Sequence, residues 1–312
     1  MSTPHIFAAC AFLIGLLFGS FLNVCIARLP RGESIVKPSS RCPNCDHTIR
    51  WYDNIPLLSW LILKVRCRDC GEKIPWQYPT VELVTALWFA FVVFRTAFQL
   101  DHLGRLPDSV PSEAFVGTTL VGITALILGF LLIGLLVMDW QTHRLPDAFT
   151  LTGIAIGFFL ICTQAIFLGP TEDQIMLKHK APITAAMSVE KGNLFLTGPE
   201  ALIGGRLVAI LGCALLLLAI RQAYKLLRNR EGMGLGDVKL LAMIAAFLGF
   251  WPAILALFAG VLTASVYGIA LLARGRANAA TRLPFGSFLA AGGLLSTLFG
   301  HVLIDKYTAL FR

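Results

Sequence analysis

The chain has 312 residues, of which 56% are hydrophobic and 14% are charged, and its mean hydropathy is +0.74. These values exclude a water-soluble globular protein, in which about 25% of the residues are charged. The net charge of +8 would form one continuous basic face in a nucleic-acid-binding protein, whereas in a membrane protein it gathers in cytoplasmic loops. We therefore expect a membrane protein with no nucleic-acid partner.

Apolar runs that approach the roughly 20 residues needed to cross a bilayer recur along the chain. They predict an all-α polytopic membrane protein with about eight transmembrane helices. The sixth is expected to be short, tilted or re-entrant, because a turn at Gly249–Pro252 (GFWP) follows it. The expected segments are 6–26, 81–98, 117–138, 148–168, 201–220, 240–250, 253–273 and 285–304.

Basic residues divide unevenly between the two sides of this arrangement. Eighteen of the 26 Lys and Arg fall in 28–80, 139–147, 221–239 and 274–284. The positive-inside rule makes this side cytoplasmic and places both termini outside. The first segment has no basic n-region and no A-x-A site, so we expect an anchor that is not cleaved.

Three domains follow from this division. Residues 1–27 form the first anchor, 28–80 form a cytoplasmic zinc-binding loop domain, and 81–312 form the main helical membrane domain. The last of these includes a polar outer loop at 169–200, which shows no catalytic pattern.

Two C-x-x-C pairs separated by 21 residues supply Cys42, Cys45, Cys67 and Cys70. Four thiolates at this spacing favour a closed, structural zinc site. A loop of this size buries little core, and the metal would stabilise its fold by on the order of 10 kcal/mol. Two disulfides or redox dithiols are the alternative, which a reducing cytoplasm disfavours. The other four cysteines are expected to be membrane packing residues: Cys10, Cys25, Cys162 and Cys213.

Two acidic residues stand at the ends of apolar runs, Asp139 in VMDWQTHRLPD and Asp237 in GMGLGDVKL. An ionisable group at such a place is a functional candidate. If the two carboxylates meet, repulsion keeps a proton on one of them, and the pair can activate water and protonate a leaving amine, as in aspartyl proteases. Gly232, Gly234 and Gly236 would allow close approach and unusual dihedrals before Asp237.

Other polar residues near these positions have simpler interpretations. Asp147 precedes an apolar run and is expected to cap its first turn. His143 is expected to be a solvated loop residue, although it could relay a proton. Glu82 lies near the start of the second span, where a carboxylate favours the helix N-terminus.

In order along the chain, these motifs resemble the type IV prepilin peptidases, the prepilin leader peptidase and N-methyltransferase enzymes of bacterial inner membranes. The resemblance covers most of the chain. Besides the two cysteine pairs and Asp139, it rests on GSFLNVCIARLP (19–30), WYDNIPLLSWL (51–61), YPTVEL (78–83), LPD (145–147), GMGLGDVKLLA (232–242) and LPFGSFLA (283–290).

The resemblance implies a bifunctional enzyme in the bacterial inner membrane. It would cut the basic leader from type IV prepilins or type II secretion pseudopilins on the cytoplasmic face. It would then methylate the new N-terminal amine with S-adenosylmethionine. Asp139 and Asp237 match the catalytic aspartates of the family, and the four cysteines of the two pairs match its metal ligands. The partners are then these substrates and membrane lipid.

Three features depart from the family pattern. Val65 stands where the family usually has Gly, two positions before the third cysteine, in a segment associated with methyl transfer. A peptidase without methyltransferase activity is therefore an alternative. Ser287 replaces a proline, and the outer loop at 169–200 is longer than usual.

Two functions of other classes are also compatible with a polytopic protein that is basic inside. A transporter with a zinc-stabilised loop would need polar residues near the bilayer midplane, whereas the acidic residues here gather at one face. A non-enzymatic scaffold would use the loop to dock pilus or secretion components.

Overall fold

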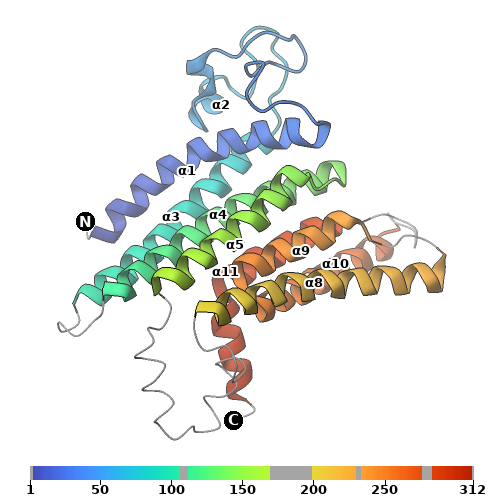
Figure 1. The fold of residues 1–312 in the computed structure, drawn as a ribbon. Coiled ribbons are helices and arrows are strands. Elements are labelled where there is room, and N and C mark those ends of the chain that lie inside the picture. The colour runs from blue at the N-terminus through green and yellow to red at the C-terminus, as the bar shows by residue number, and fades with distance from the viewer. Residues whose placement is uncertain (1–2, 106–111, 169–198, 230–232, 276–282, 311–312) are drawn as a thin grey trace, which may run out of the picture. The chain divides into compact units, whose positions relative to one another are not determined.

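The computed structural model of the protein describes residues 3–105, 112–168, 199–229, 233–275 and 283–310. The expected outer loop at 169–200 lies outside them, apart from its last two residues. The described chain is helical, with only two isolated β-bridges (Figure 1). Its helices are α1 (Thr3–Arg28), η1 (Leu29–Arg31), η2 (Trp51–Asn54), α2 (Leu58–Ile62), α3 (Gln77–Gly104), α4 (Ser112–Thr142), α5 (Asp147–Leu168), α8 (Pro199–Arg228), α9 (Leu235–Leu248), α10 (Phe250–Ala273) and α11 (Phe285–Ala309).

The chain divides into two compact units, 1–146 and 147–312. The first contains α1, α3, α4 and the loop between α1 and α3, and the second contains the remaining helices. Within the described residues, six helices are long and apolar enough to cross a membrane, and α11 makes a seventh if its two bent parts count as one span. The predicted all-α polytopic architecture is confirmed.

Large apolar side chains on the outer faces of these helices agree with a lipid environment. The exposed fraction is 63% for Leu17 of α1, 69% for Val208 of α8 and 65% for Phe258 of α10. In water such faces would be costly to expose, whereas lipid tails solvate them.

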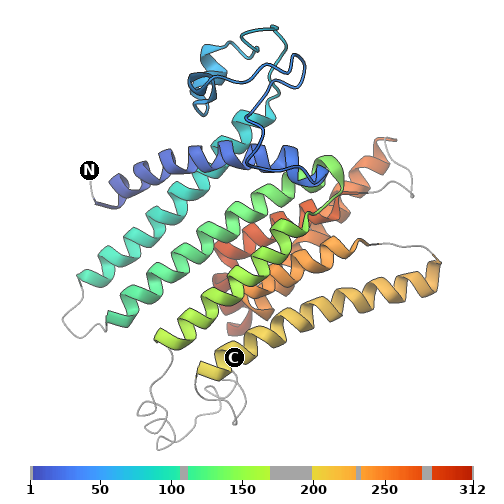
Figure 2. The same cartoon turned by 45° about the horizontal axis from the view of Figure 1, so that its top comes forward.

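In the first unit, α1 packs closely on α3 because two glycines of α1 face it. A Cβ atom added to Gly15 would lie 2.7 Å from the Cα atom of Ala86, and one added to Gly19 would lie 2.6 Å from the Cα atom of Glu82. Figure 2 shows that the connecting loop leaves the last turn of α1 and enters the first turn of α3 at the same end of this helix pair.

In the second unit, α9 is the central helix. It contacts α5, α8, α10 and α11, and ten of its 14 residues are buried. Its length of about 20 Å at 1.5 Å per residue is less than the hydrocarbon thickness of about 30 Å. The chain breaks after α9 at Gly249, where φ is +93°, and α10 begins at Phe250. The predicted short sixth segment and the turn after it are thus present. Because α9 is too short to cross the hydrocarbon layer along its axis, its packing against neighbouring helices is what stabilises it.

We predict that Gly19→Ala destabilises the first unit by about 1–3 kcal/mol, because the added methyl group overlaps the α3 backbone. The melting temperature of the purified protein in detergent should fall. The matched control is Gly205→Ala in α8, where an added Cβ has no neighbour within 4 Å. That variant should be unchanged or slightly more stable. Equal melting temperatures for Gly19→Ala and the wild type would contradict the close packing.

Candidate active site and metal centre

The two C-x-x-C pairs form similar turns. In the first, the Cys42 N–H donates to the His47 carbonyl at 3.0 Å, and in the second the Cys67 N–H donates to the Glu72 carbonyl at 2.8 Å. One antiparallel bridge closes each turn, between Arg41 and Thr48 in the first pair and between the corresponding residues of the second. Local hydrogen bonding therefore shapes each turn before any metal binds.

The turns bring all four predicted metal-ligating cysteines together. Their sulfur atoms lie within 4.8 Å of one another, and Cys42 Sγ is 3.8 Å from Cys70 Sγ. Tetrahedral zinc with Zn–S bonds of about 2.3 Å separates its sulfur ligands by about 3.8 Å. None of the four is joined in a disulfide in the described structure. The cluster has the donor set and spacing of a four-thiolate metal site.

Proton binding differs among these thiols. The N–H of Glu72 and the side chain of Asn44 lower the pKa of Cys70 to about 7. At Cys45 the N–H of His47 acts to lower the pKa, but desolvation and the thiols of Cys42 and Cys70 raise it to about 12. A metal ion binds the thiolate form, so metal binding here would release protons.

An ion pair fastens the second turn to the segment between the two cysteine pairs. Arg68 binds Asp53 through two hydrogen bonds, Nη2 to Oδ1 at 2.6 Å and Nε to Oδ2 at 2.8 Å. The guanidinium group lowers the pKa of Asp53. Such bidentate pairs add geometric specificity, and this one holds η2 beside the metal cluster.

The two predicted catalytic aspartates are both buried, and each lies at one end of its helix. Asp139 is in the last turn of α4 and is 5% exposed, and Asp237 is in the first turn of α9 and is 8% exposed. The structure describes Asp139 within the first unit and Asp237 within the second. The Gly234 N–H donates to Asp237 Oδ2 at 3.3 Å.

The role expected of the glycines before Asp237 is not found at Gly234. Gly234 is extended, with φ −75° and ψ 154°, a conformation that any residue adopts. A Cβ atom there would meet Asp237 Oδ2 at 3.7 Å, an ordinary contact. The predicted unusual dihedral is therefore wrong at Gly234. Gly232 lies outside the described residues.

Asp147 begins α5 as expected, and its carboxylate has a further partner. Oδ1 accepts a hydrogen bond from Lys239 Nζ of α9 at 2.6 Å, so Asp147 links two helices of the second unit. His143 is exposed in the turn after α4, with φ +50°, in agreement with a solvated loop residue.

Two polar residues beneath the cysteine loop were not recognised as a pair from the sequence. Glu82 lies one turn inside α3, is 8% exposed, and accepts a hydrogen bond from the Leu57 N–H at 2.8 Å. Asn23 of α1 is 4% exposed and donates to the Tyr78 carbonyl at 3.0 Å. An Asn inside an apolar run was the available signal. Glu82 therefore also connects α3 to the cysteine loop, in addition to placing a carboxyl group near the start of a helix.

Val65 has a left-handed backbone, with φ +68°. Both of its backbone groups are bonded: its N–H donates to the Trp60 carbonyl at 3.0 Å, and its carbonyl accepts from the Ile74 N–H at 2.8 Å. A β-branched residue is strained in this region, whereas Gly is not. Gly, the residue expected here from the resemblance, would therefore suit the conformation at this position better than Val does.

We predict that Val65→Gly stabilises the loop by about 0.5–1 kcal/mol, because relief of about 1–2 kcal/mol of strain exceeds the entropic cost of Gly. Hydrogen exchange of the loop amides should slow. The control is Val36→Gly, at an exposed position without positive φ, which should be neutral or destabilising. Faster exchange in Val65→Gly would show that the left-handed conformation is not a source of strain.

Comparison with known families covers most of the chain. Residues 13–96 match the bacterial peptidase A24 N-terminal domain, a range that includes most of α1, the cysteine loop and most of α3. Residues 125–269 match the type IV leader peptidase family and include both Asp139 and Asp237. No solved structure matches the chain.

Curated relatives agree with these matches. A protein of Myxococcus xanthus is 36% identical, over 88% of this chain and 67% of its own length. Proteins of Stutzerimonas stutzeri (30% identical, 100% and 97% covered) and Aeromonas salmonicida (31% identical, 97% and 94% covered) are similar throughout. All three are named prepilin leader peptidase/N-methyltransferase. The chain therefore belongs to the type IV leader peptidase family and is an enzyme with the peptidase and N-methyltransferase activities of that family.

Proposed function

We propose that the protein removes the basic leader of type IV prepilins or type II secretion pseudopilins, with Asp139 and Asp237 as the catalytic pair. The observation that carries this proposal is the placement of these two carboxylates. Each is more than 90% buried and lies at the end of a helix. A buried ionisable group beside a membrane surface is costly, which supports a functional role.

The chemistry is general acid–base hydrolysis by two carboxyl groups that share one proton. The ionised carboxylate takes a proton from water, and the resulting hydroxide adds to the carbonyl carbon of the scissile peptide. The protonated carboxyl group gives its proton to the carbonyl oxygen. When the C–N bond breaks, the carboxyl group that took the proton from water gives it to the leaving amine, which becomes the new N-terminus. A hydroxyl of the intermediate returns a proton to the other carboxylate, which restores the pair.

We place this reaction on the cytoplasmic face of the bacterial inner membrane. The end of α4 is followed by Arg144, and α8 ends with Lys225 and Arg228 before the chain reaches α9. Cytoplasmic loops collect such residues. Both aspartates would then be on the cytoplasmic side of the membrane, where the leader of the substrate lies.

The second activity is N-methylation of the amine that cleavage exposes, as the names of the relatives indicate for those proteins. S-adenosylmethionine is the proposed methyl donor. When bound, it supplies a methyl group on a sulfonium, which the neutral amine attacks as the C–S bond breaks. The protein has to bind both molecules and leave the amine unprotonated.

We assign zinc to the four-cysteine cluster as a structural metal. The sulfur separations fit a tetrahedral ion, and four protein ligands leave no position for water. The metal would hold both turns of the loop and take no part in proton transfer.

We predict that Asp139→Asn and Asp237→Asn each abolish cleavage, because a single carboxyl group cannot act as both acid and base. Mass spectrometry of a prepilin incubated with the purified protein would measure leader loss and methyl gain separately. Asp101→Asn is the control, since that residue pairs with Arg105 on the surface at the far end of α3. Full leader removal by either catalytic variant would exclude the pair.

We also predict one zinc ion per chain, lost in Cys42→Ser or Cys70→Ser. Removal of one thiolate leaves an incomplete site, and the loop should then become sensitive to protease. Cys10→Ser, in α1 and outside the cluster, should keep the metal. Metal analysis of purified protein gives the stoichiometry. A wild-type protein without zinc, or a Cys42→Ser variant that retains it, would refute the assignment.

A further inference from the structure

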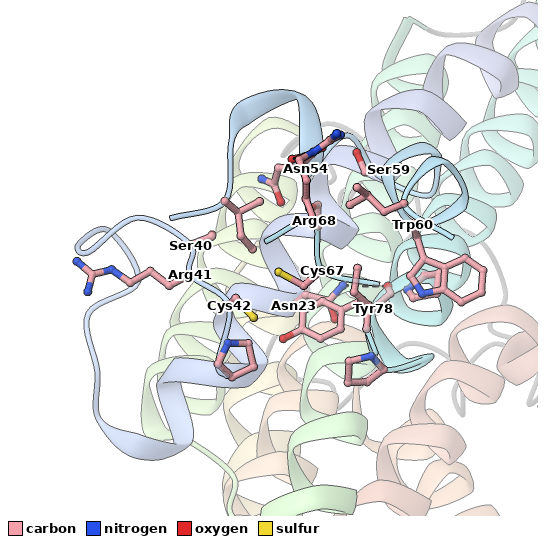
Figure 3. A pocket seen from close by; sticks show the side chains of 18 of the residues that line it. Asn23, Ser40, Arg41, Cys42, Asn54, Ser59, Trp60, Cys67, Arg68 and Tyr78 are labelled. Carbon is pink, nitrogen blue, oxygen red and sulfur yellow. Dashed lines mark hydrogen bonds and ion pairs between the residues drawn. The ribbon is translucent and has the colours of Figure 1, made fainter. Parts of the chain in front are cut away.

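The short helix α2 of the cysteine loop exposes its apolar side and buries its polar side. Ser59 is 7% exposed, and together with Trp60 it lines a cavity of about 240 Å³ between the loop and the adjoining ends of α1 and α3 (Figure 3). Leu58, Leu61 and Ile62 share one helix face at i, i+3 and i+4, and none of them lines this cavity. Their exposed fractions are 49%, 64% and 64%. A helix in water would bury such a face, so it indicates an apolar partner outside the described residues.

The exposed apolar surface of α3 leads to the same place. Leu83, Leu87 and Phe91 are 41%, 53% and 47% exposed, and they follow Trp76 at helical spacing along one face. Trp76 directly precedes α3, is 70% exposed, and has its ring centroid 4.4 Å from that of Trp60 in α2. Because α3 is long and apolar enough to cross a membrane, its lipid-facing surface continues through Trp76 to α2. Trp is enriched at the level where lipid chains meet their headgroups.

Three basic residues stand next to the apolar face of α2. Lys64 and Arg66 follow the helix within four residues, and an antiparallel bridge places Lys73 opposite Arg66, on the same side of the chain. All three are exposed, and within the described residues none of them forms an ion pair with a carboxylate. An apolar helix face with basic side chains beside it is typical of a helix that lies in the membrane interface and attracts anionic lipids.

We propose that α2 docks on the surface of the bilayer that holds α1 and α3. The loop joins these two helices at one end of the pair, which confines α2 to one membrane surface (Figure 2). The three apolar side chains of α2 enter the boundary between headgroups and acyl chains, Trp76 lies at the same level, and the three basic side chains contact the phosphates of anionic lipids. The partner is lipid rather than a second protein chain. The proposal is independent of the roles assigned to the two aspartates.

A photoreactive side chain on the apolar face tests this contact directly. The full-length, zinc-loaded protein, with p-benzoyl-phenylalanine in place of Leu61, is irradiated in nanodiscs that contain phosphatidylglycerol. The matched control carries the same probe in place of Glu33, an exposed acidic residue of the same loop. Mass spectrometry should find roughly fivefold or more acyl-chain adduct with the probe at position 61, because an interfacial helix buries its apolar face about 5–10 Å into the headgroup–acyl boundary. Equal lipid labelling at both positions, or a cross-linked dimer instead of a lipid adduct, would overturn the proposal.

A charge on the same face provides a second test. In nanodiscs, Leu61→Asp should speed hydrogen exchange of the Leu61 and Leu63 amides, which donate to the Leu57 and Ser59 carbonyls, by roughly tenfold, because a carboxylate is driven out of the lipid boundary. Val36→Asp is the control, at a 77% exposed position outside α2, and should leave this exchange unchanged.

The result of Leu61→Asp distinguishes lipid from water at this face. If α2 faced water, the variant would remove exposed apolar surface, and unchanged or slower exchange would therefore contradict docking. Zinc content reports whether each variant retains a folded loop. The photoreactive probe needs no charge on α2, so it decides the question if Leu61→Asp loses its metal.

Lipid charge tests the contacts of the basic residues. With the probe in place of Leu61, the yield of lipid adduct should fall roughly twofold or more when phosphatidylcholine replaces phosphatidylglycerol, because each Lys or Arg near the surface is attracted to anionic headgroups. High salt should remove most of the difference between the two lipids. Equal yields in both lipids at low salt would show that the basic residues make no contact with anionic lipid.

Discussion

The close approach of α1 to α3 is the contact on which the first unit depends. Gly15 and Gly19 remove the side chains that would separate the two helices, and a Cβ at Gly19 would overlap the backbone of Glu82. Small residues at helix contacts are the usual means of tight packing in membranes, where lipid competes equally for apolar surface. Because the helices touch at this level, Asn23 can bind the start of α3 and Glu82 can reach the loop.

The loop above these helices has few buried apolar residues, so other interactions determine its shape. Many of its large apolar side chains are exposed, including Trp51 and Trp76 at 82% and 70%. The four-cysteine cluster, the Asp53–Arg68 pair and the hydrogen bond from Leu57 to Glu82 take the place of a core. The first two act within the loop, and only the third joins it to the membrane helices.

Local sequence patterns predicted the features that depend on neighbours in the chain. Apolar runs located the spans, GFWP located the break at Gly249, and cysteine spacing brought four thiols together. Packing between distant segments was not predictable in this way. The bond between Glu82 and Leu57 joins residues 25 positions apart across a folded loop, and the cavity exists only when both ends of that loop are in place.

The same distinction applies to Gly234 and Asp147. Glycine is permissive, which predicts an unusual backbone at Gly234, but permissive residues also adopt ordinary extended backbone, as this one does. The position of Asp147 at the start of α5 was predictable from its neighbours, whereas its bond to a lysine 92 positions away was not. The residue type indicates which interactions a side chain can make, whereas its actual partner depends on how the helices pack.

Four residues of the loop other than glycine have positive φ: Asp46, Leu57, Lys64 and Val65. Such conformations persist only where the surroundings over-determine them. Glu82 holds the N–H of Leu57, and Trp60 and Ile74 hold the two backbone groups of Val65. A loop that has so little core and still retains these conformations must be held from both sides, by the cysteine turns and by α3. The cavity lies between these two supports, which gives it a fixed wall in an otherwise weakly packed segment.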